Sequence, residues 1–332
     1  MKKLLLFIAL AAAGSLFVGC DSSVPENKTQ SASSPKKWKI GVSIPAATHG
    51  WSGGVVWHAE RAKEEMEKAS PDAEFMIVTS SDAQDQVNRI ENLMVRGADA
   101  LVVMAQEPGP LLSVCEQARK KGVYLVIVSN PLSKDIQNVF VNGDNSGFGA
   151  AAAEAMGLVL KGQGNIVVME GYSSPINTER MEAFRKTLAA KYPAIRILDS
   201  RLAYYSPEKA LALMENYIQK YPDIDGVWAG DDDALLGAVK ACEERAPGSL
   251  KIKAMVGGGG SRKIVKKIMD SDPLVKATVT YPPQIIQEGM KAALDGLRNG
   301  KMPPDGRSRI TVPSRIVLRE NAGEFYFPDS VY

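Results

Sequence analysis

The sequence has few of the side chains on which metal binding and nucleophilic catalysis depend. Its 332 residues include three cysteines and two histidines, and these are not spaced as zinc ligands are. No Gly-x-Ser-x-Gly segment places a serine nucleophile on a sharp turn. We therefore expect no catalytic residues, no metal and no cofactor. An exported hydrolase acting on sugars is kept as a remote alternative.

A basic surface is also missing. There are 40 lysine and arginine residues against 38 aspartate and glutamate residues, and the basic ones form no cluster. Removal of the first 19 residues, as argued next, takes away two lysines and lowers the formal net charge from +2 to 0. A neutral chain without a basic patch argues against nucleic acid as a partner.

One long apolar run lies near the start, from Leu4 to Val18, after Lys2 and Lys3. It is too short for a comfortable membrane span, and its basic start is typical of an export signal. The run ends at Gly19-Cys20 and resembles a bacterial lipoprotein signal, although Phe17 stands where that signal usually has leucine. The resemblance implies a signal peptide over residues 1–19 and a lipid on Cys20. Ordinary secretion is the alternative.

Residues 20–36 carry the lipidated cysteine and a Ser-, Pro- and Lys-rich stretch that has nothing to bury, so we expect a disordered tether there. The protein is then expected in the periplasm or at the cell surface, held to the membrane by its lipid. Asp21 resembles a signal that retains lipoproteins at the inner membrane of some Gram-negative bacteria. The other cysteines, Cys115 and Cys242, each lie in an apolar helical pattern and are expected as separate buried thiols rather than a disulfide.

From Lys39 onward, short apolar runs alternate with helical patterns. Strands are expected at 39–44, 74–79, 100–104, 124–129, 139–142, 165–169, 196–202, 226–229, 251–256, 277–281 and 315–318. Helices are expected at 53–68, 83–96, 110–121, 146–160, 177–191, 207–220, 232–245, 261–270 and 283–299. Start signals at Asp82 and Ser206-Pro207, and left-handed ends at Gly97, Gly122 and Gly162, support these bounds. This alternation predicts an α/β fold with doubly wound parallel sheets. The pattern restarts at Asn165, which favours two similar lobes over one very wide sheet.

Several segments, in this order and spacing, resemble the type I periplasmic binding proteins of bacterial ABC importers, in their ribose-binding-like branch. The resemblance covers Lys37 to about Leu318 and rests on residues 40–43, 86–101, 143–147, 178–184 and 230–238. Lac-repressor-type regulators share the fold. The export signal, in place of a helix-turn-helix segment before Lys37, indicates the transport branch.

This resemblance implies two doubly wound lobes joined by a three-crossover hinge. The crossovers fall near Gly143-Asp144, Tyr281-Pro282 and Gly306-Arg307. The N-terminal lobe is then 37–143 plus 282–306, and the C-terminal lobe is 144–281 plus 307–332. The implied protein is a monomer that captures a small sugar or polyol and delivers it to an ABC permease. A sensor that docks on a chemoreceptor or sensor kinase is the alternative.

The loop after the first strand offers the first candidate ligand contacts, His49 and Trp51. A sugar ring has an apolar C–H face and a polar rim, so a flat indole suits the one and side-chain donors and acceptors suit the other. The loop lies outside the carboxyl end of a parallel strand, where open α/β sheets bind ligands. Alternatively, Trp51 packs against its own helix.

The resemblance places further ligand positions at the ends of later elements: Gln106, Asn130, Thr178, Tyr205, Asp231, Gly259 and Tyr281. Asn130 follows Ser129 where aldose-binding relatives carry an Asp-Arg pair, so a ribose-like ligand is in doubt. Thr178 falls where a second arginine is usual, and Arg180 is expected to pair within its own lobe. Three of these positions have a structural alternative: a turn at Asn130, the core at Tyr205, and a helix cap at Asp231.

The run Gly257-Gly258-Gly259-Gly260-Ser261 lies between an expected strand and an expected helix. Consecutive glycines can let backbone N–H groups hold an anion. The run lacks the lysine of a P-loop and the spacing of a dinucleotide-binding motif. A loop that makes no anion contact is therefore the favoured interpretation of this run. Contact between the run and an anionic group of the ligand is the alternative.

Overall fold

The computed structural model describes residues 37–47, 50–246, 248–300 and 308–332, which belong to one compact unit. The export signal, Cys20 and the tether lie outside the described residues. So do His49 and Gly306-Arg307, near which the third crossover is expected.

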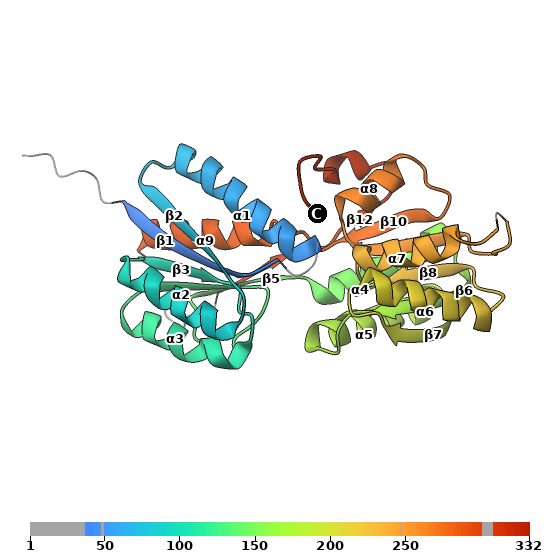
Figure 1. The fold of residues 1–332 in the computed structure, drawn as a ribbon, viewed down its shortest axis with the longest axis horizontal. Helices are drawn as coiled ribbons and strands as arrows, with labels where there is room; N and C mark the ends of the chain where they lie inside the picture. The colour runs from blue at the N-terminus through green and yellow to red at the C-terminus, as the bar shows by residue number, and fades with distance from the viewer. Residues whose placement is uncertain (1–36, 48–49, 247, 301–307) are drawn as a thin grey trace, which may run out of the picture. The chain divides into compact units, whose positions relative to one another are not determined.

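The first sheet contains, among the described residues, six parallel strands in the order β11-β5-β4-β3-β1-β2. Their bounds are β1 (Trp38–Pro45), β2 (Ala73–Ser80), β3 (Ala100–Val103), β4 (Tyr124–Val128), β5 (Val139–Gly143) and β11 (Ser308–Val312). One face is covered by α1 (Gly50–Ala69) and α9 (Ile285–Asn299), and the other by α2 (Ala83–Val95) and α3 (Pro108–Lys120) (Figure 1).

The second sheet has the order β12-β10-β9-β8-β6-β7, again over the described residues. Its strands are β6 (Gln163–Glu170), β7 (Ala194–Leu202), β8 (Gly226–Ala229), β9 (Ala254–Gly259), β10 (Val275–Thr280) and the antiparallel β12 (Ile316–Val317). Helices α4 (Asn145–Val159) and α5 (Pro175–Lys191) cover one face. The other face carries α6 (Pro207–Lys220), α7 (Asp232–Glu243), α8 (Arg262–Met269) and the short η1 (Ala322–Phe325).

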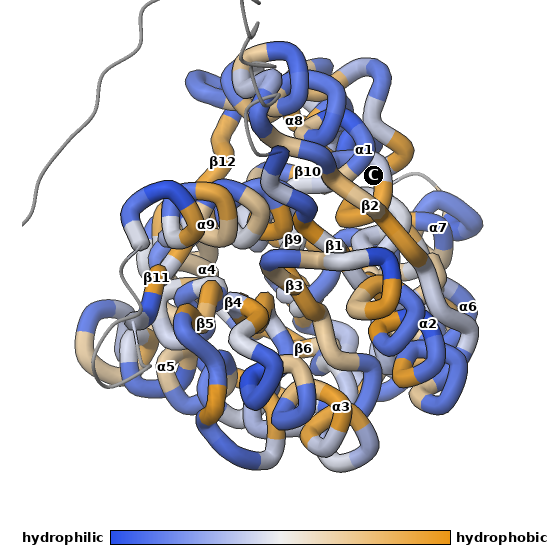
Figure 2. Tube along the Cα trace, turned by 90° about the vertical axis from the view of Figure 1, so that its left-hand side faces the viewer, coloured by the Kyte–Doolittle hydropathy of each residue, from blue (hydrophilic) through white to orange (hydrophobic). Residues whose placement is uncertain are grey.

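The central strands explain why the sequence forms this fold. Every residue of β3, β4 and β8 is buried, as expected for parallel strands covered on both faces. Figure 2 shows β3 as mainly hydrophobic, while many hydrophilic residues lie on the outer helices. In the second lobe Trp228 of β8 stacks on Phe184 of α5, with ring centroids 3.9 Å apart. The expected fold of two doubly wound lobes is confirmed.

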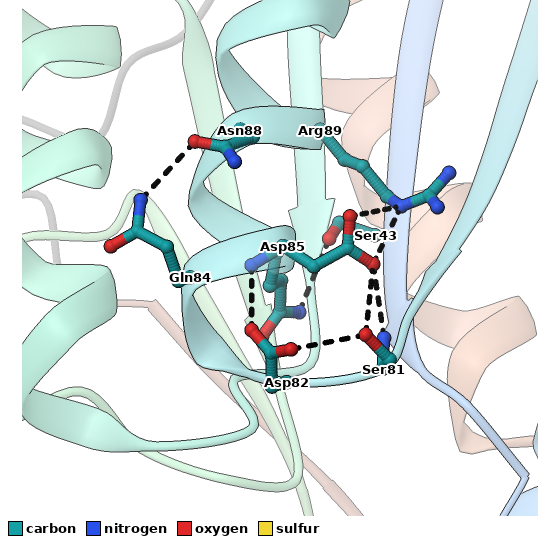
Figure 3. A network of polar contacts seen from close by, with 8 residues as sticks. Ser43, Ser81, Asp82, Gln84, Asp85, Asn88 and Arg89 are labelled. Atoms are coloured by element: carbon teal, nitrogen blue, oxygen red, sulfur yellow. Dashed lines mark hydrogen bonds and ion pairs between the residues drawn. The ribbon is translucent and has the colours of Figure 1, made fainter.

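Local signals in the sequence fix the helix ends. The Asp82 side chain accepts a 2.8 Å hydrogen bond from the Asp85 amide and caps α2. Figure 3 shows the surrounding network, in which the Asp85 carboxylate accepts from the Ser81 amide and from Arg89 Nε. Ser206 caps α6, as expected. Gly97, Gly122 and Gly162 have φ of 81°, 78° and 81° and end helices in the left-handed conformation.

Two expectations about strands were wrong. The strand expected at 251–256 runs from Ala254 to Gly259, so most of the glycine run is inside β9 rather than in a loop. The strand β11 was not expected, and it pairs in parallel with β5 in the first sheet. Residues 308–312 therefore belong with the N-terminal lobe, not the C-terminal one. The third crossover therefore lies between β11 and β12, after Val312, and not near Gly306-Arg307 as expected.

Further findings concern the thiols, the helices and metal-binding groups. Cys115 and Cys242 are buried and free, as expected. Within the described part of the chain, no helix is both long and apolar enough to cross a membrane. The same residues contain no group of three or more histidine, cysteine, aspartate or glutamate side chains placed to hold a metal ion.

Candidate ligand-binding site

A cavity of about 180 Å³ lies between the carboxyl ends of the two sheets. The first lobe contributes Trp51, Ser129 and Asn130 to its wall. The second lobe contributes residues from the starts of α4, α5 and α7, from the end of β9 and from the crossover at Tyr281. This is the position at which open α/β sheets bind ligands.

Trp51 lies in the first turn of α1 and reaches across to the second crossover. Its indole Nε1 donates a 2.7 Å hydrogen bond to the Tyr281 carbonyl oxygen. The two rings lie 5.8 Å apart at their centroids, and the Tyr281 hydroxyl is 3.3 Å from Asn142 Oδ1. Trp51 thus lines the cavity with its polar edge directed to the backbone. An indole held in this way is suited to contact the apolar face of a ring.

Asn130 follows β4 in a turn that begins in an unusual conformation. Ser129 has a φ of 61°, and a non-glycine residue in this region is a sign of local constraint. The Asn130 Nδ2 donates a 2.8 Å hydrogen bond to the Ala105 carbonyl, which ties the turn to the end of β3. Asn130 therefore combines the turn role with a place in the cavity wall.

Asp231 is the buried carboxyl of the site, at the start of α7. Its Oδ1 accepts hydrogen bonds from the amides of Asp233 and Ala234, at 2.9 and 3.3 Å, and so caps the helix. Burial and the neighbouring carboxylates of Asp233 and Asp232 raise the pKa of Asp231 well above its ordinary value. A carboxyl group in this environment can donate as well as accept hydrogen bonds, which suits a ligand with several hydroxyl groups.

Asp232 accepts hydrogen bonds from the backbone amides that an anion would need at the glycine run. Its Oδ2 accepts hydrogen bonds from the amides of Gly260 and Ser261, at 2.9 and 2.6 Å, and its Oδ1 accepts from Thr278 Oγ1 at 2.8 Å. Burial raises the pKa of Asp232 to about 6, although these hydrogen bonds lower it. The amides at the end of the run are therefore occupied by the protein's own carboxylate.

Tyr205 lines this cavity and also a second, adjoining cavity of about 550 Å³. Tyr204 and Tyr205 both have positive φ, 59° and 57°, so the chain is constrained at the rim between the two cavities. Tyr172 packs edge-on against both rings, at centroid distances of 5.5 and 5.4 Å. Tyr205 is therefore a wall residue rather than a core residue.

Two expected site residues lie away from the cavity wall. Gln106 Nε2 donates to the Ser81 carbonyl at 3.2 Å, and the Gln106 amide donates to Gln86 Oε1 at 2.9 Å. Thr178 is exposed, and its hydroxyl donates to the Ser174 carbonyl at 3.1 Å. Because α5 starts at Pro175, its first two turns present Ile176 and Arg180 to the cavity instead. One helical turn separates those two residues, and Thr178 points elsewhere.

Arg180 and Phe148 were missed as wall residues. Arg180 Nε donates to Asn145 Oδ1 at 3.1 Å, within the second lobe as expected. Its guanidinium also lies between two rings, 4.2 Å from the Phe148 centroid and 4.4 Å from the Tyr281 centroid. Arg180 belongs to α5 and Phe148 to α4. No local pattern in the sequence therefore indicates that these two side chains meet at the cavity.

Tyr332 is a further wall residue that sequence reasoning missed. It lines both cavities and is 6% exposed. Its position depends on residues 326–332 passing from the second lobe towards α1, and no local pattern in the sequence indicates that path.

Residues 40–302 match the family model described as the periplasmic binding protein domain. The chain belongs to the periplasmic binding protein family. This match spans both lobes of the binding protein and includes Trp51, Asn130, Asp231 and Tyr281. Tyr332 lies beyond it.

Two named relatives of the binding protein cover different shares of its length. The ribose import binding protein of Bacillus subtilis (strain 168) is 24% identical over 86% of this chain and 90% of its own. The xylitol-binding protein of Mycolicibacterium smegmatis is 32% identical over 50% of this chain and 48% of its own.

Solved structures support the fold of the binding protein. An ABC transporter solute-binding protein from Bacillus halodurans with bound myo-inositol has a TM-score of 0.72 at 21% identity, covering 90% of this chain and 99% of its own. One from Actinobacillus succinogenes with bound D-allose has a TM-score of 0.74 at 20% identity, covering 87% of this chain and all of its own.

Proposed function

We propose that this protein binds a small sugar or polyol between its two lobes, outside the cytoplasm, and delivers it to an ABC permease. One observation carries the proposal: Trp51 of the first lobe and Asp231 of the second line the same cavity. The related proteins named for ribose and xylitol, and the similar structures with myo-inositol and D-allose, support this ligand class.

The chemistry of the cavity fits such a ligand. Trp51 and Phe148 offer apolar faces, while Asn130, Arg180 and Asp231 offer donors and acceptors. A volume of about 180 Å³ lies below the roughly 300–1,000 Å³ of sites for drug-sized ligands, which favours a small ligand. Among the described residues, the wall lacks the Asp-Arg pair that the resemblance implies for aldose-binding relatives, so Asp231, Arg180 and Asn130 are left to bind the hydroxyl groups.

The protein is proposed to be exported and held to the membrane by a lipid on Cys20. The basic pair, the apolar run and Gly19-Cys20 support this anchor. A tether of residues 20–36 would let the lobes reach a permease in the same membrane. Transfer to the permease can be tested by co-purification with the membrane subunits in the presence of ligand.

The experiment is ligand titration by calorimetry, after a thermal-shift screen over sugars, polyols and sugar acids. We expect saturable binding at micromolar or lower concentration, without any change in the ligand. Trp51→Ala should weaken binding at least tenfold because it removes the apolar face. Asp231→Ala should weaken it roughly 10- to 100-fold because a carboxyl hydrogen bond contributes about 1.5–3 kcal/mol.

Each variant has a matched control. Trp57→Ala removes an indole from the same helix, away from the cavity wall. Asp82→Ala removes the same kind of helix cap from α2. Both controls should bind like the parent. A parent protein that binds no sugar or polyol, or that converts one, would refute the proposed function.

A further inference from the structure

The segment from Tyr326 to Tyr332 carries one side chain into the cleft. That side chain belongs to Tyr332. The middle of the segment is held to the second lobe, because Arg262 of α8 donates a 2.8 Å hydrogen bond to the Pro328 carbonyl oxygen. The Phe327 ring meets His58 of α1 edge-on, with centroids 5.7 Å apart. The Tyr332 amide then donates to Ser330 Oγ at 3.2 Å. Residues from both lobes therefore set the position of Tyr332.

The start of α1 is shaped to receive this segment. It contains Gly50, Gly53 and Gly54, although glycine is a poor helix former. A Cβ atom built on Gly54 would lie 2.8 Å from Tyr332 Cβ, and one on Gly50 would lie 2.9 Å from Tyr332 Cδ2. One built on Gly53 would make only an ordinary contact, 3.5 Å from Val331 Cγ2. Gly50 and Gly54 thus leave the space that Tyr332 fills.

The hydroxyl group of Tyr332 reaches the second lobe at the end of β9. A Cβ atom built on Gly259 would lie 1.9 Å from the Tyr332 hydroxyl oxygen, and Gly259 has a φ of 124°. That oxygen is fully buried and has no hydrogen-bond partner among the described residues. A buried polar group without a partner is costly, so a group that binds there would recover the lost hydrogen bond.

The surroundings keep this hydroxyl protonated. Burial, followed by the charges of Asp231, Asp232 and Asp233, raises the pKa of Tyr332 well above its ordinary value, and Arg180 lowers it only in part. The phenol is therefore a hydrogen-bond donor throughout the neutral range. Asp231 and Gly259 line the same cavity as Tyr332, so the donor lies beside two positions that the sequence had assigned to the ligand.

We propose that the phenolic hydroxyl of Tyr332 donates a hydrogen bond to a hydroxyl group of the bound ligand and helps to determine its specificity. The proposal rests on the proposed function, because it assigns a further contact to the same polyhydroxylated ligand. It adds a site residue from beyond the part of the chain that matches the family model.

The test uses Tyr332→Phe in the full chain, which keeps the ring and removes only the hydroxyl. Affinity for the sugar or polyol identified by the screen should fall roughly 3- to 10-fold, as for one neutral hydrogen bond. The ligand-free variant should be as thermally stable as the parent or more stable, because an unpaired buried hydroxyl is gone. Tyr326→Phe, in the same segment but outside the cavity wall, should change neither property.

Deoxy analogues of the ligand separate recognition from packing. For one analogue the parent should lose the same factor in affinity that Tyr332→Phe loses for the intact ligand, and the variant should not discriminate between the two. Unchanged affinity in Tyr332→Phe, or tighter binding because the ring obstructs the ligand, would overturn the proposal while leaving the proposed function intact. A parent that binds no sugar or polyol would instead overturn the function and this inference with it.

Discussion

At Asp231 a helix cap and a place in the cavity wall coincide. Asp231 lies two residues after the carboxyl end of β8 and directly before α7, so one side chain can serve both roles. The sequence set these roles as alternatives, and the structure shows the cap together with the wall position. Contact between Asp231 and the ligand stays a prediction.

His58 gives a prediction on pH at the residue scale. It is 3% exposed, and burial, helped by Arg61, lowers its pKa from 6.5 to about 4, against a smaller opposing effect of Glu65. Below pH 6.5 the unfolded chain binds a proton that the folded protein does not bind until about pH 4. The free energy of unfolding should therefore fall between these pH values, by at most about 3 kcal/mol from this residue.

Urea denaturation at several pH values checks this effect, with His58→Gln as the comparison. The variant should lose less stability than the parent as the pH falls from 6.5 to 4, because glutamine does not titrate. Equal slopes of stability against pH in the two proteins would contradict the assignment. Asp232, whose raised pKa has the opposite effect in part of this window, is present in both proteins and cancels.

At the scale of elements, the alternation of apolar runs and helical patterns predicted nearly every helix and strand. The caps at Asp82 and Ser206 and the glycines at helix ends were correct because these signals act within a few residues. The bounds of β9 were wrong because glycine usually weakens strands. Here Gly257 and Gly258 are required by packing: Cβ atoms built on them would lie 2.1 Å from Asp232 Oδ1 and 2.5 Å from Phe148 Cζ.

Two helix starts meet between the lobes. The Gly50 amide of α1 donates a 3.1 Å hydrogen bond to Asp233 Oδ2 in the first turn of α7. A carboxylate is favourable at both N-termini because of the helix dipoles. Asp233→Ala should therefore weaken ligand binding roughly 3- to 10-fold, as expected for the loss of one hydrogen bond that holds the two lobes together.

Calorimetry on Asp233→Ala and Asp233→Asn measures this contribution. The asparagine variant keeps an acceptor oxygen and should bind more tightly than the alanine variant. Asp223→Ala removes an exposed carboxylate that pairs with Lys251, and it should bind like the parent. Identical affinities for Asp233→Ala and the parent would show that the interlobe hydrogen bond does not affect binding.

At the scale of the whole molecule, the lobes, the crossovers and the proposed membrane anchor depend on different kinds of information. The restart of the strand–helix pattern at Asn165 was enough to predict two lobes. The sequence did not indicate to which lobe residues 308–312 belong, because β11 is an edge strand with mainly exposed residues and no strong apolar pattern. Its pairing with β5 is decided only by the chain's return to the first sheet.

The proposed anchor gives a prediction for the protein in the cell. Cys20→Ser should move the protein from the membrane fraction to the soluble fraction, because the proposed lipid would be attached to the Cys20 thiol. Growth of the cells with a radioactive fatty acid, followed by separation of the membrane and soluble fractions, measures this change. Cys115→Ser is the control and should stay with the membrane. A parent protein found only in the soluble fraction would favour ordinary secretion.

The sequence by itself determined the fold class, the helix ends, and the family, because periodic burial, caps and spaced motifs are local along the chain. Only the tertiary structure decided which side chains share the cavity. Arg180 and Tyr332 lie there, and Thr178 does not, because the phase of a helix and the path of a distant segment fix where a side chain points. These depend on packing between residues far apart in sequence, which no local pattern records.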